Sequence, residues 1–309
     1  MTDKRFLARP PRRKRFGQHF LHDPSVLERI VNALQPLQTD RVVEIGPGGG
    51  ALTRLLLETG LGQLDAVEID RDLAGLLRQE LAAYPGFTLH QADALDFDFA
   101  GLARSRGAPL RVVGNLPYNI STPLLFHLLA SAASIQDMHV MLQREVAERI
   151  AAAPGDSSYG RLTIMLAPWV SVETLFEVGP GAFRPPPKVW SAVMRLSVRP
   201  QPSFQVSPHF APVVSTAFSH RRKTLRNALR SLLSQEQIEA AGVNPGVRPE
   251  TLAPEAFNAL GRQLDGCGDT PAREPDCCGD TPARQPDCCG DTPAREPDCC
   301  GDTPARQPD

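Results

Sequence analysis

The sequence predicts an α/β fold whose core is a parallel, doubly wound sheet. Buried-strand patterns alternate with helical patterns along the first half of the chain, and the strand patterns fall at 41–45, 65–69, 87–91, 110–114 and 138–142. Such alternation is typical of parallel strands joined by crossover helices. Short helical patterns replace the strands after about residue 199. We therefore expect a flexible basic N-terminus (1–14), an α/β domain (15–199), a small helical domain (200–264) and a disordered repeat tail (265–309).

Charge is unevenly distributed along the 309 residues. Residues 266–309 carry 4 Arg against 10 Asp and Glu, which leaves residues 1–265 with 29 Lys and Arg against 25 acidic residues, a net charge of +4. Seven Lys and Arg lie within the first 15 residues, and a second basic cluster comprises His220, Arg221, Arg222, Lys223, Arg226 and Arg230. Basic clusters are usually solvated surface, but two of them flanking a catalytic sheet suggest a polyanionic partner.

Targeting signals and metal sites are not expected. No run of about 18 apolar residues occurs, and the basic N-terminus precedes no apolar stretch, so we expect a cytoplasmic protein without a membrane span. All seven cysteines lie beyond residue 266. Neither a disulfide framework nor a structural zinc site therefore supports the folded part.

The first helix and strand lead into a glycine-rich turn. Asp23 is a plausible helix N-cap with Pro24 at the first helical position, and apolar residues recur at helical spacing as far as Leu34. The strand at 41–45 then runs directly into Gly46-Pro47-Gly48-Gly49-Gly50, before a helix that contains Leu52, Leu55 and Leu56. Glycines let the backbone approach a ligand closely, and the helix N-terminus adds a positive dipole end. A nucleotide-like ligand is one interpretation, although a glycine-rich turn alone is weak evidence.

Acidic residues lie at the ends of the next two strands. Glu68 and Asp70 lie about 20 residues after the glycines, where a ribose hydroxyl would be recognised. Either acid could instead be a helix N-cap, and we assign that role to Asp70 because a helical pattern starts just after it. Asp93 follows the strand at 87–91 and could accept a hydrogen bond from an adenine amino group or cap the next turn.

The fourth strand ends in Asn115-Leu116-Pro117-Tyr118, at the edge where open α/β sheets bind ligands. The turn offers a flat ring, a side-chain amide and a proline-stiffened backbone carbonyl. These groups suit an aromatic amine, because Tyr118 can stack on its ring while the Asn115 oxygen and a backbone carbonyl accept its two N–H bonds. The alternative is an ordinary strand-to-helix loop with a buried tyrosine.

The later part of the α/β domain contains two further strand patterns, at 172–178 and 189–198, after a helix near 159–169. Between them lies Phe183-Arg184-Pro185-Pro186-Pro187-Lys188-Val189, where the prolines stiffen the backbone after Phe183. Phe183 could be a core residue, but its expected position in a loop also allows a functional role. Helical patterns follow at 224–233 and 254–264, the first of them directly after the second basic cluster.

The tail repeats an eleven-residue unit that begins Cys267-Gly268-Asp269-Thr270-Pro271. Two prolines per unit and the lack of an apolar stripe exclude a coiled coil, so the tail is expected to be disordered. Its paired cysteines lack the spacing and the histidines of a zinc site.

The order Glu44-x-Gly46-x-Gly48-x-Gly50 differs from G-x-G-x-x-G, the glycine pattern of dinucleotide-binding proteins. It resembles motif I of the S-adenosylmethionine-dependent methyltransferases. The Asn115 to Tyr118 turn resembles the motif of methyltransferases that act on exocyclic amines. Residues 12–264 together resemble the small-subunit ribosomal RNA adenine dimethyltransferases, of the rRNA adenine N6-methyltransferase family. The segments that carry this likeness are 15–21, Asn119-Ile120-Ser121-Thr122-Pro123, 183–189 and 218–227.

The resemblance implies a Rossmann-like class I methyltransferase domain with S-adenosyl-L-methionine as cofactor. It implies that His19, which stands where many relatives have Asn, and Leu21 contact the cofactor. Gly46, Gly48, Glu68, Asp93 and Asn115 would hold its methionine end, ribose and adenine. Asn115, Leu116, Pro117, Tyr118 and Phe183 would form the catalytic site, and Arg221, Arg222, Lys223 and Arg226 would bind RNA.

The implied reaction is N6,N6-dimethylation of two adjacent adenosines near the 3′ end of 16S rRNA, by a monomer acting on the 30S subunit or its precursor. Three alternatives remain open at this point. The chain could methylate a single adenine in large-subunit RNA, or act chiefly as a ribosome-assembly factor. A nicotinamide oxidoreductase is disfavoured by the glycine spacing and by the lack of a catalytic His or Lys constellation.

Overall fold

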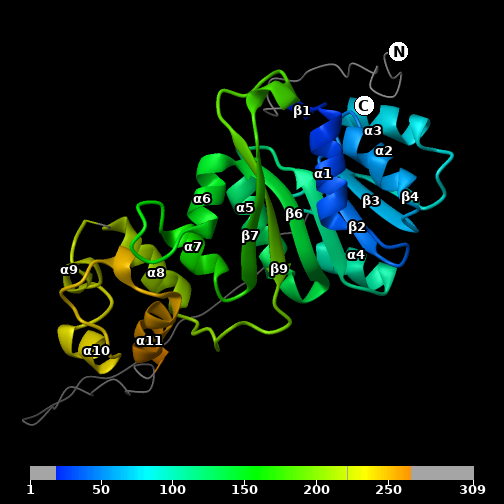
Figure 1. Ribbon diagram of the computed structural model, residues 1–309. Coiled ribbons are helices and arrows are strands. Elements are labelled where there is room, and N and C mark those ends of the chain that lie inside the picture. The colour runs from blue at the N-terminus through cyan, green and yellow to red at the C-terminus, as the bar shows by residue number, and fades with distance from the viewer. Residues whose placement is uncertain (1–18, 221, 266–309) are drawn as a thin grey trace, which may run out of the picture. The chain divides into compact units, whose positions relative to one another are not determined.

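The computed structural model describes residues 19–220 and 222–265 and contains a mixed seven-stranded sheet (Figure 1). Five parallel strands come first in the sheet order, and β9 then pairs antiparallel with both β6 and β7. The predicted α/β fold is therefore confirmed. From one edge to the other the strands are β4 (Phe87–Gln91), β3 (Gln63–Glu68), β2 (Arg41–Ile45), β5 (Leu110–Asn115), β6 (Ile135–Gln143), β9 (Ser191–Val198) and β7 (Val170–Val178).

Helices cover both faces of the sheet, because successive strand residues point to opposite sides. Val42 belongs to an apolar cluster that includes residues of α1 and α2, whereas Val43 belongs to a second cluster that includes residues of α4, α5 and α6. Asp23 caps α1 by accepting from the Ser25 and Val26 N–H groups, as predicted. The helices of this part are α1 (Pro24–Leu34), α2 (Ala51–Glu58), α3 (Arg71–Glu80), α4 (Phe99–Arg106), α5 (Ser121–Ala130), α6 (Arg144–Ala151) and α7 (Arg161–Leu166).

The sheet order reverses direction at β2, whose two neighbours are β3 and β5. In open α/β sheets ligands bind beyond the carboxyl ends of the strands at such a switch point. The glycine turn follows β2, and Asn115 is the last residue of β5. The topology therefore brings together two motifs that are about 65 residues apart in the sequence.

A short two-stranded ribbon lies outside the main sheet. Strand β1 (Phe20–Leu21) pairs antiparallel with β8 (Phe183–Arg184), and Leu21 stands opposite Phe183. The expectation that Phe183 lies in a loop is therefore wrong. Two-residue strands carry no periodicity, and their formation depends on the partner segment rather than on local sequence.

The helices expected beyond residue 200 are present, and they share an apolar core. This core also includes Tyr159 and Ile164, and the Tyr159 hydroxyl donates to the Leu252 carbonyl at 2.7 Å. The helix expected at 224–233 is shorter, since α9 spans only Leu225–Ala228. The other helices here are α8 (Phe210–Ser219), α10 (Gln235–Ala240) and α11 (Pro254–Asp265), with a 3₁₀ turn at Pro249–Thr251. Two further 3₁₀ turns, at Ala132–Ser134 and Pro180–Ala182, lie in the preceding α/β part. The expected tail lies outside the described residues.

Candidate active site

The glycine turn after β2 is built on backbone that favours glycine. Gly46, Gly48 and Gly50 have φ angles of 67°, 56° and 74°. A Cβ added at Gly48 would lie 2.9 Å from Cδ1 of Phe20, so the absence of a side chain lets the Phe20 ring of β1 pack directly on the turn. The turn is tied to β3 because the Gly46 N–H donates to the Val67 carbonyl at 2.9 Å.

Glu68, at the end of β3, holds this turn from the other side. It is 4% exposed, and its two carboxylate oxygens accept from the Gly48 N–H at 3.0 Å and the Asp70 N–H at 2.9 Å. Burial raises the pKa of Glu68, and these backbone N–H groups oppose the rise. Asp70 caps α3 through the Asp72 and Leu73 N–H groups, as predicted.

Glu44 is a second buried acid beside the turn, which the sequence marked only as part of the glycine motif. It is 2% exposed, and one of its carboxylate oxygens has no hydrogen-bond partner among the described residues. Burial raises the pKa of Glu44 to about 7, the Thr53 hydroxyl and the charge of Arg54 oppose the rise, and the nearby charge of Glu68 adds to it. An unpaired buried carboxylate oxygen is costly, and it marks a position where a cationic or donor group of a ligand would be stabilised.

Asp93 lies just beyond β4, beside the strand that carries Glu68. The Ala92 N–H donates to the Glu68 carbonyl at 3.1 Å, which places the Asp93 turn next to the end of β3. One Asp93 oxygen accepts from the Leu95 N–H at 2.9 Å, so the capping role is present in this structure. Asp93 is half-buried, and contact with an adenine amino group stays a prediction.

Asn115, Tyr118 and His19 come together at the end of β5. The Asn115 side-chain N–H donates to the His19 carbonyl at 2.9 Å, and the His19 ring stacks on Tyr118 with centroids 5.7 Å apart and planes 28° apart. His19 Nδ1 lies 2.8 Å from the Pro185 carbonyl oxygen. These contacts join three segments that are far apart in the sequence, so the predicted cofactor and substrate residues do lie side by side.

The backbone of the turn is fixed by hydrogen bonds at both ends. The buried Leu116 donates its N–H to the Met141 carbonyl of β6 at 3.1 Å, and the Pro117 carbonyl accepts from the Ile120 N–H at 3.1 Å. The Tyr118 hydroxyl lies 2.6 Å from the hydroxyl of the fully buried Ser191. Burial raises the pKa of Tyr118, and the Ser191 hydrogen bond opposes the rise, so the phenol stays neutral and its ring is held from two sides.

Phe183 and Leu21 are less exposed to solvent than expected. Phe183 is 2% exposed and Leu21 9%, and both belong to the apolar cluster that packs α1 against the sheet. In this structure Phe183 is therefore a core residue, the alternative noted from sequence. Contact between its ring and a substrate requires the β1–β8 ribbon to shift, and it stays a prediction.

Five of the six residues of the second basic cluster are described, and all five are exposed. Arg222 and Lys223 lie between α8 and α9, whereas Arg226 lies in α9 and donates to the Gln235 side-chain oxygen at 3.2 Å. Arg221 lies outside the described residues. The exposed cations are free to meet an anionic partner, which agrees with the predicted RNA contact but does not test it.

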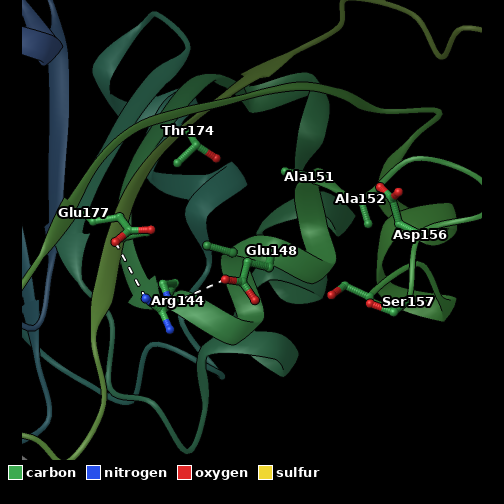
Figure 2. Close-up of a pocket in the computed structure, with 11 residues that line it drawn as sticks. Arg144, Glu148, Ala151, Ala152, Asp156, Ser157, Thr174 and Glu177 are labelled. Carbon is green, nitrogen blue, oxygen red and sulfur yellow. Dashed lines mark ion pairs between the residues drawn. The ribbon is translucent and has the colours of Figure 1, made fainter.

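A separate pocket of about 400 Å³ lies between α6 and β7 (Figure 2). Arg144 lines it together with three carboxylates, and it pairs with Glu148 at 3.4 Å and Glu177 at 3.8 Å. None of the predicted site residues lines this pocket, and its excess of carboxylates does not suit a phosphate. Within residues 19–220 and 222–265 no group of three His, Cys, Asp or Glu side chains could hold a metal ion, and no helix is long and apolar enough to cross a membrane.

Comparisons with known proteins agree with this geometry. The family model of the ribosomal RNA adenine dimethylases matches residues 11–264. The ribosomal RNA small subunit methyltransferase A of Marinobacter nauticus is 56% identical over 243 residues, 78% of this chain and 87% of that protein. The protein of the same name from Pseudomonas aeruginosa is 55% identical over 259 residues, 82% of this chain and 94% of that protein.

Two solved structures share the fold over most of the chain. A dimethyladenosine transferase from Plasmodium falciparum matches with a TM-score of 0.68 and 25% identity, over 78% of this chain and 96% of that one. The 23S rRNA methyltransferase ErmE matches with a TM-score of 0.60 and 28% identity, over 80% and 99%. The chain therefore belongs to the ribosomal RNA adenine dimethylases, enzymes that transfer methyl groups from S-adenosylmethionine to adenine in ribosomal RNA.

Proposed function

We propose that the chain dimethylates N6 of two adjacent adenosines near the 3′ end of 16S rRNA, as a cytoplasmic monomer acting on the 30S subunit or its precursor. The observation that carries the choice of reaction is the turn at the end of β5, where Asn115 and Tyr118 are held by His19 and Ser191. The choice of small-subunit RNA is supported by relatives of 50–56% identity that are named for that subunit, against 28% for ErmE.

The residues around the glycine turn fit S-adenosylmethionine. The unpaired oxygen of Glu44 suits the ammonium group of the methionine end, and Gly46 leaves room beside the turn, where an added Cβ would meet only the Asn115 carbonyl oxygen at 4.0 Å. Glu68 suits the ribose hydroxyls, because each of its oxygens can accept a second hydrogen bond. Asp93 would accept from the adenine amino group, and His19 and Leu21 would close over the cofactor from β1.

S-adenosylmethionine, when bound, supplies an electrophilic sulfonium methyl. The chain's task is to make the exocyclic nitrogen of adenine nucleophilic, since its lone pair is delocalised into the ring. Hydrogen bonds from the two N–H groups to the Asn115 oxygen and to the Leu116 or Pro117 carbonyl would localise that lone pair. The Pro117 carbonyl already accepts from Ile120, which favours Leu116 as the second acceptor.

Tyr118 would stack on the target adenine and Phe183 would cover its other face after the ribbon shifts. A neutral Asn at position 115 binds the amine without burying a carboxylate beside it, and no general base is required. Arg221, Arg222, Lys223 and Arg226 would contact RNA phosphates.

Substrate choice can be tested by mass spectrometry. The protein and S-adenosylmethionine are incubated either with 30S particles from a strain that lacks adenine dimethylation or with 23S rRNA, and the RNA digests are compared. We expect dimethyladenine at two adjacent positions near the 3′ end of 16S rRNA and none in 23S rRNA. Methylation confined to 23S rRNA would refute the proposed substrate.

A further inference from the structure

Trp190 is a large aromatic side chain left open to solvent. It is 48% exposed, and the preceding Val189 is 43% exposed, although most large apolar side chains of the described residues lie in the core. The chain has two tryptophans, and the other, Trp169, packs partly buried against the core. An exposed indole directly beside the buried Ser191 suggests a contact surface.

The position of Trp190 links it to the adenine site. Trp190 directly precedes Ser191, whose hydroxyl lies 2.6 Å from that of Tyr118. Adding the backbone step and the serine side chain places the Trp190 Cα within about 9 Å of the Tyr118 hydroxyl. Trp190 and Tyr118 therefore lie at the same end of the sheet, and nearby nucleotides of one RNA strand could contact both.

The backbone around Trp190 is held firmly. The Trp190 carbonyl accepts from the Arg144 N–H at 2.9 Å, at the start of α6. Beyond the ring lies Gly179, where an added Cβ would be 3.6 Å from the Trp190 Cη2 atom. The Trp190 backbone is therefore fixed just before β9, and its ring lies next to Gly179.

The charge near Trp190 favours a nucleic acid over a protein. Arg184 and Lys188 are exposed in the same segment, and no acidic residue lies between positions 184 and 190. The neighbouring pocket carries carboxylates, and one of them, Glu177 in β7, pairs with Arg144 at 3.8 Å (Figure 2). Aromatic rings interleaved with cations are typical of surfaces that bind single-stranded nucleic acids.

We propose that Trp190 stacks on a nucleotide that flanks the target adenine, while Arg184 and Lys188 contact the adjoining phosphates. The inference rests on the proposed function, because an adenine drawn into the site leaves its neighbour without a stacking partner. The indole replaces that lost contact. Stacking on an aromatic face tolerates any base, so Trp190 contributes affinity and positioning rather than sequence choice.

The test uses the full chain and a short single-stranded oligoadenylate at low salt. Stacking should quench Trp190 fluorescence during titration, and Trp190→Phe, which retains Trp169, should lose the quench while keeping affinity within about threefold. Trp190→Ala should bind the oligoadenylate about tenfold more weakly. Val189→Ala removes an equally exposed apolar side chain without a ring and should bind like the parent protein. All variants should bind S-adenosylmethionine equally.

The outcomes separate this inference from the proposed function. Trp190→Ala with unchanged affinity, or a Val189→Ala loss as large as that of Trp190→Ala, would overturn the stacking role. A quench that persists in Trp190→Phe would overturn it too. Another outcome is a parent protein that shows quenching of Trp190 fluorescence by oligoadenylate but methylates neither 16S rRNA in 30S particles nor 23S rRNA. That result would refute the proposed function without refuting the stacking role of Trp190.

Discussion

Asn115 illustrates what the sequence could and could not predict about single residues. Its place at a strand end and its neighbours predicted an amine-binding turn. Its contact with the His19 carbonyl, and that of Tyr118 with Ser191, could not be predicted, since the paired residues are 96 and 73 positions apart. Trp190 was missed because nothing local distinguishes an exposed tryptophan from a core one.

Glu44 provides a prediction that depends on pH. Because its pKa is raised from 4.5 to about 7 in the folded protein, the folded state keeps a proton that the unfolded chain has released between these pH values. Raising the pH through this window therefore lowers the free energy of unfolding, by up to about 3 kcal/mol. Glu44→Gln should remove this loss, so the variant should melt at a higher temperature than the parent at pH 8 and differ little at pH 4.5.

The same substitution should weaken cofactor binding, because the amide cannot pair with an ammonium group. Calorimetric titration with S-adenosylmethionine at pH 8 would measure this loss. If Glu44→Gln melted below the parent protein at pH 8, the raised pKa of Glu44 in the folded protein would be refuted.

Among the elements, long periodic segments were predicted well and short ones poorly. Strands β2 and β4 have the predicted bounds, and α11 extends one residue beyond its prediction. Strands β1 and β8 were not predicted, and α9 is shorter than its pattern suggested. Two-residue strands and single-turn helices are stabilised by tertiary contacts, which leave no repeating pattern in the sequence.

The contact between β1 and the glycine turn can be tested through Gly48. Gly48→Ala would add a Cβ 2.9 Å from the Phe20 ring, at a φ of +56°, so it should displace β1 and weaken S-adenosylmethionine binding at least about tenfold. Gly60→Ala is the matched control, because its φ is +81° but nothing lies within 4 Å of an added Cβ.

Both variants should lose about 1–2 kcal/mol of stability from backbone strain. Only Gly48→Ala should lose cofactor affinity. Equal affinities in the two variants would show that the packing of Phe20 on the turn has no role in cofactor binding.

For the whole molecule, alternation of strands and helices predicted the class of fold, and the structure supplied the strand order. The order β4-β3-β2-β5-β6-β9-β7 depends on which strands pair, and no local pattern encodes this. The same pairing brings the glycine turn, Glu68 and Asn115 to one edge of the sheet. The expected RNA cluster is described only in part, and the repeat tail not at all.

The central claim is that methyl transfer to adenine occurs at the turn after β5. The direct measurement is the rate of dimethyladenine formation in 16S rRNA within 30S particles, by mass spectrometry, for the parent protein and for Asn115→Ala. The parent should form dimethyladenine at two adjacent positions, and the variant should be at least about 100-fold slower, since it lacks the positioned acceptor. Melting curves and RNA affinity should change little. A variant that is folded and forms dimethyladenine at nearly the parent rate would contradict the account.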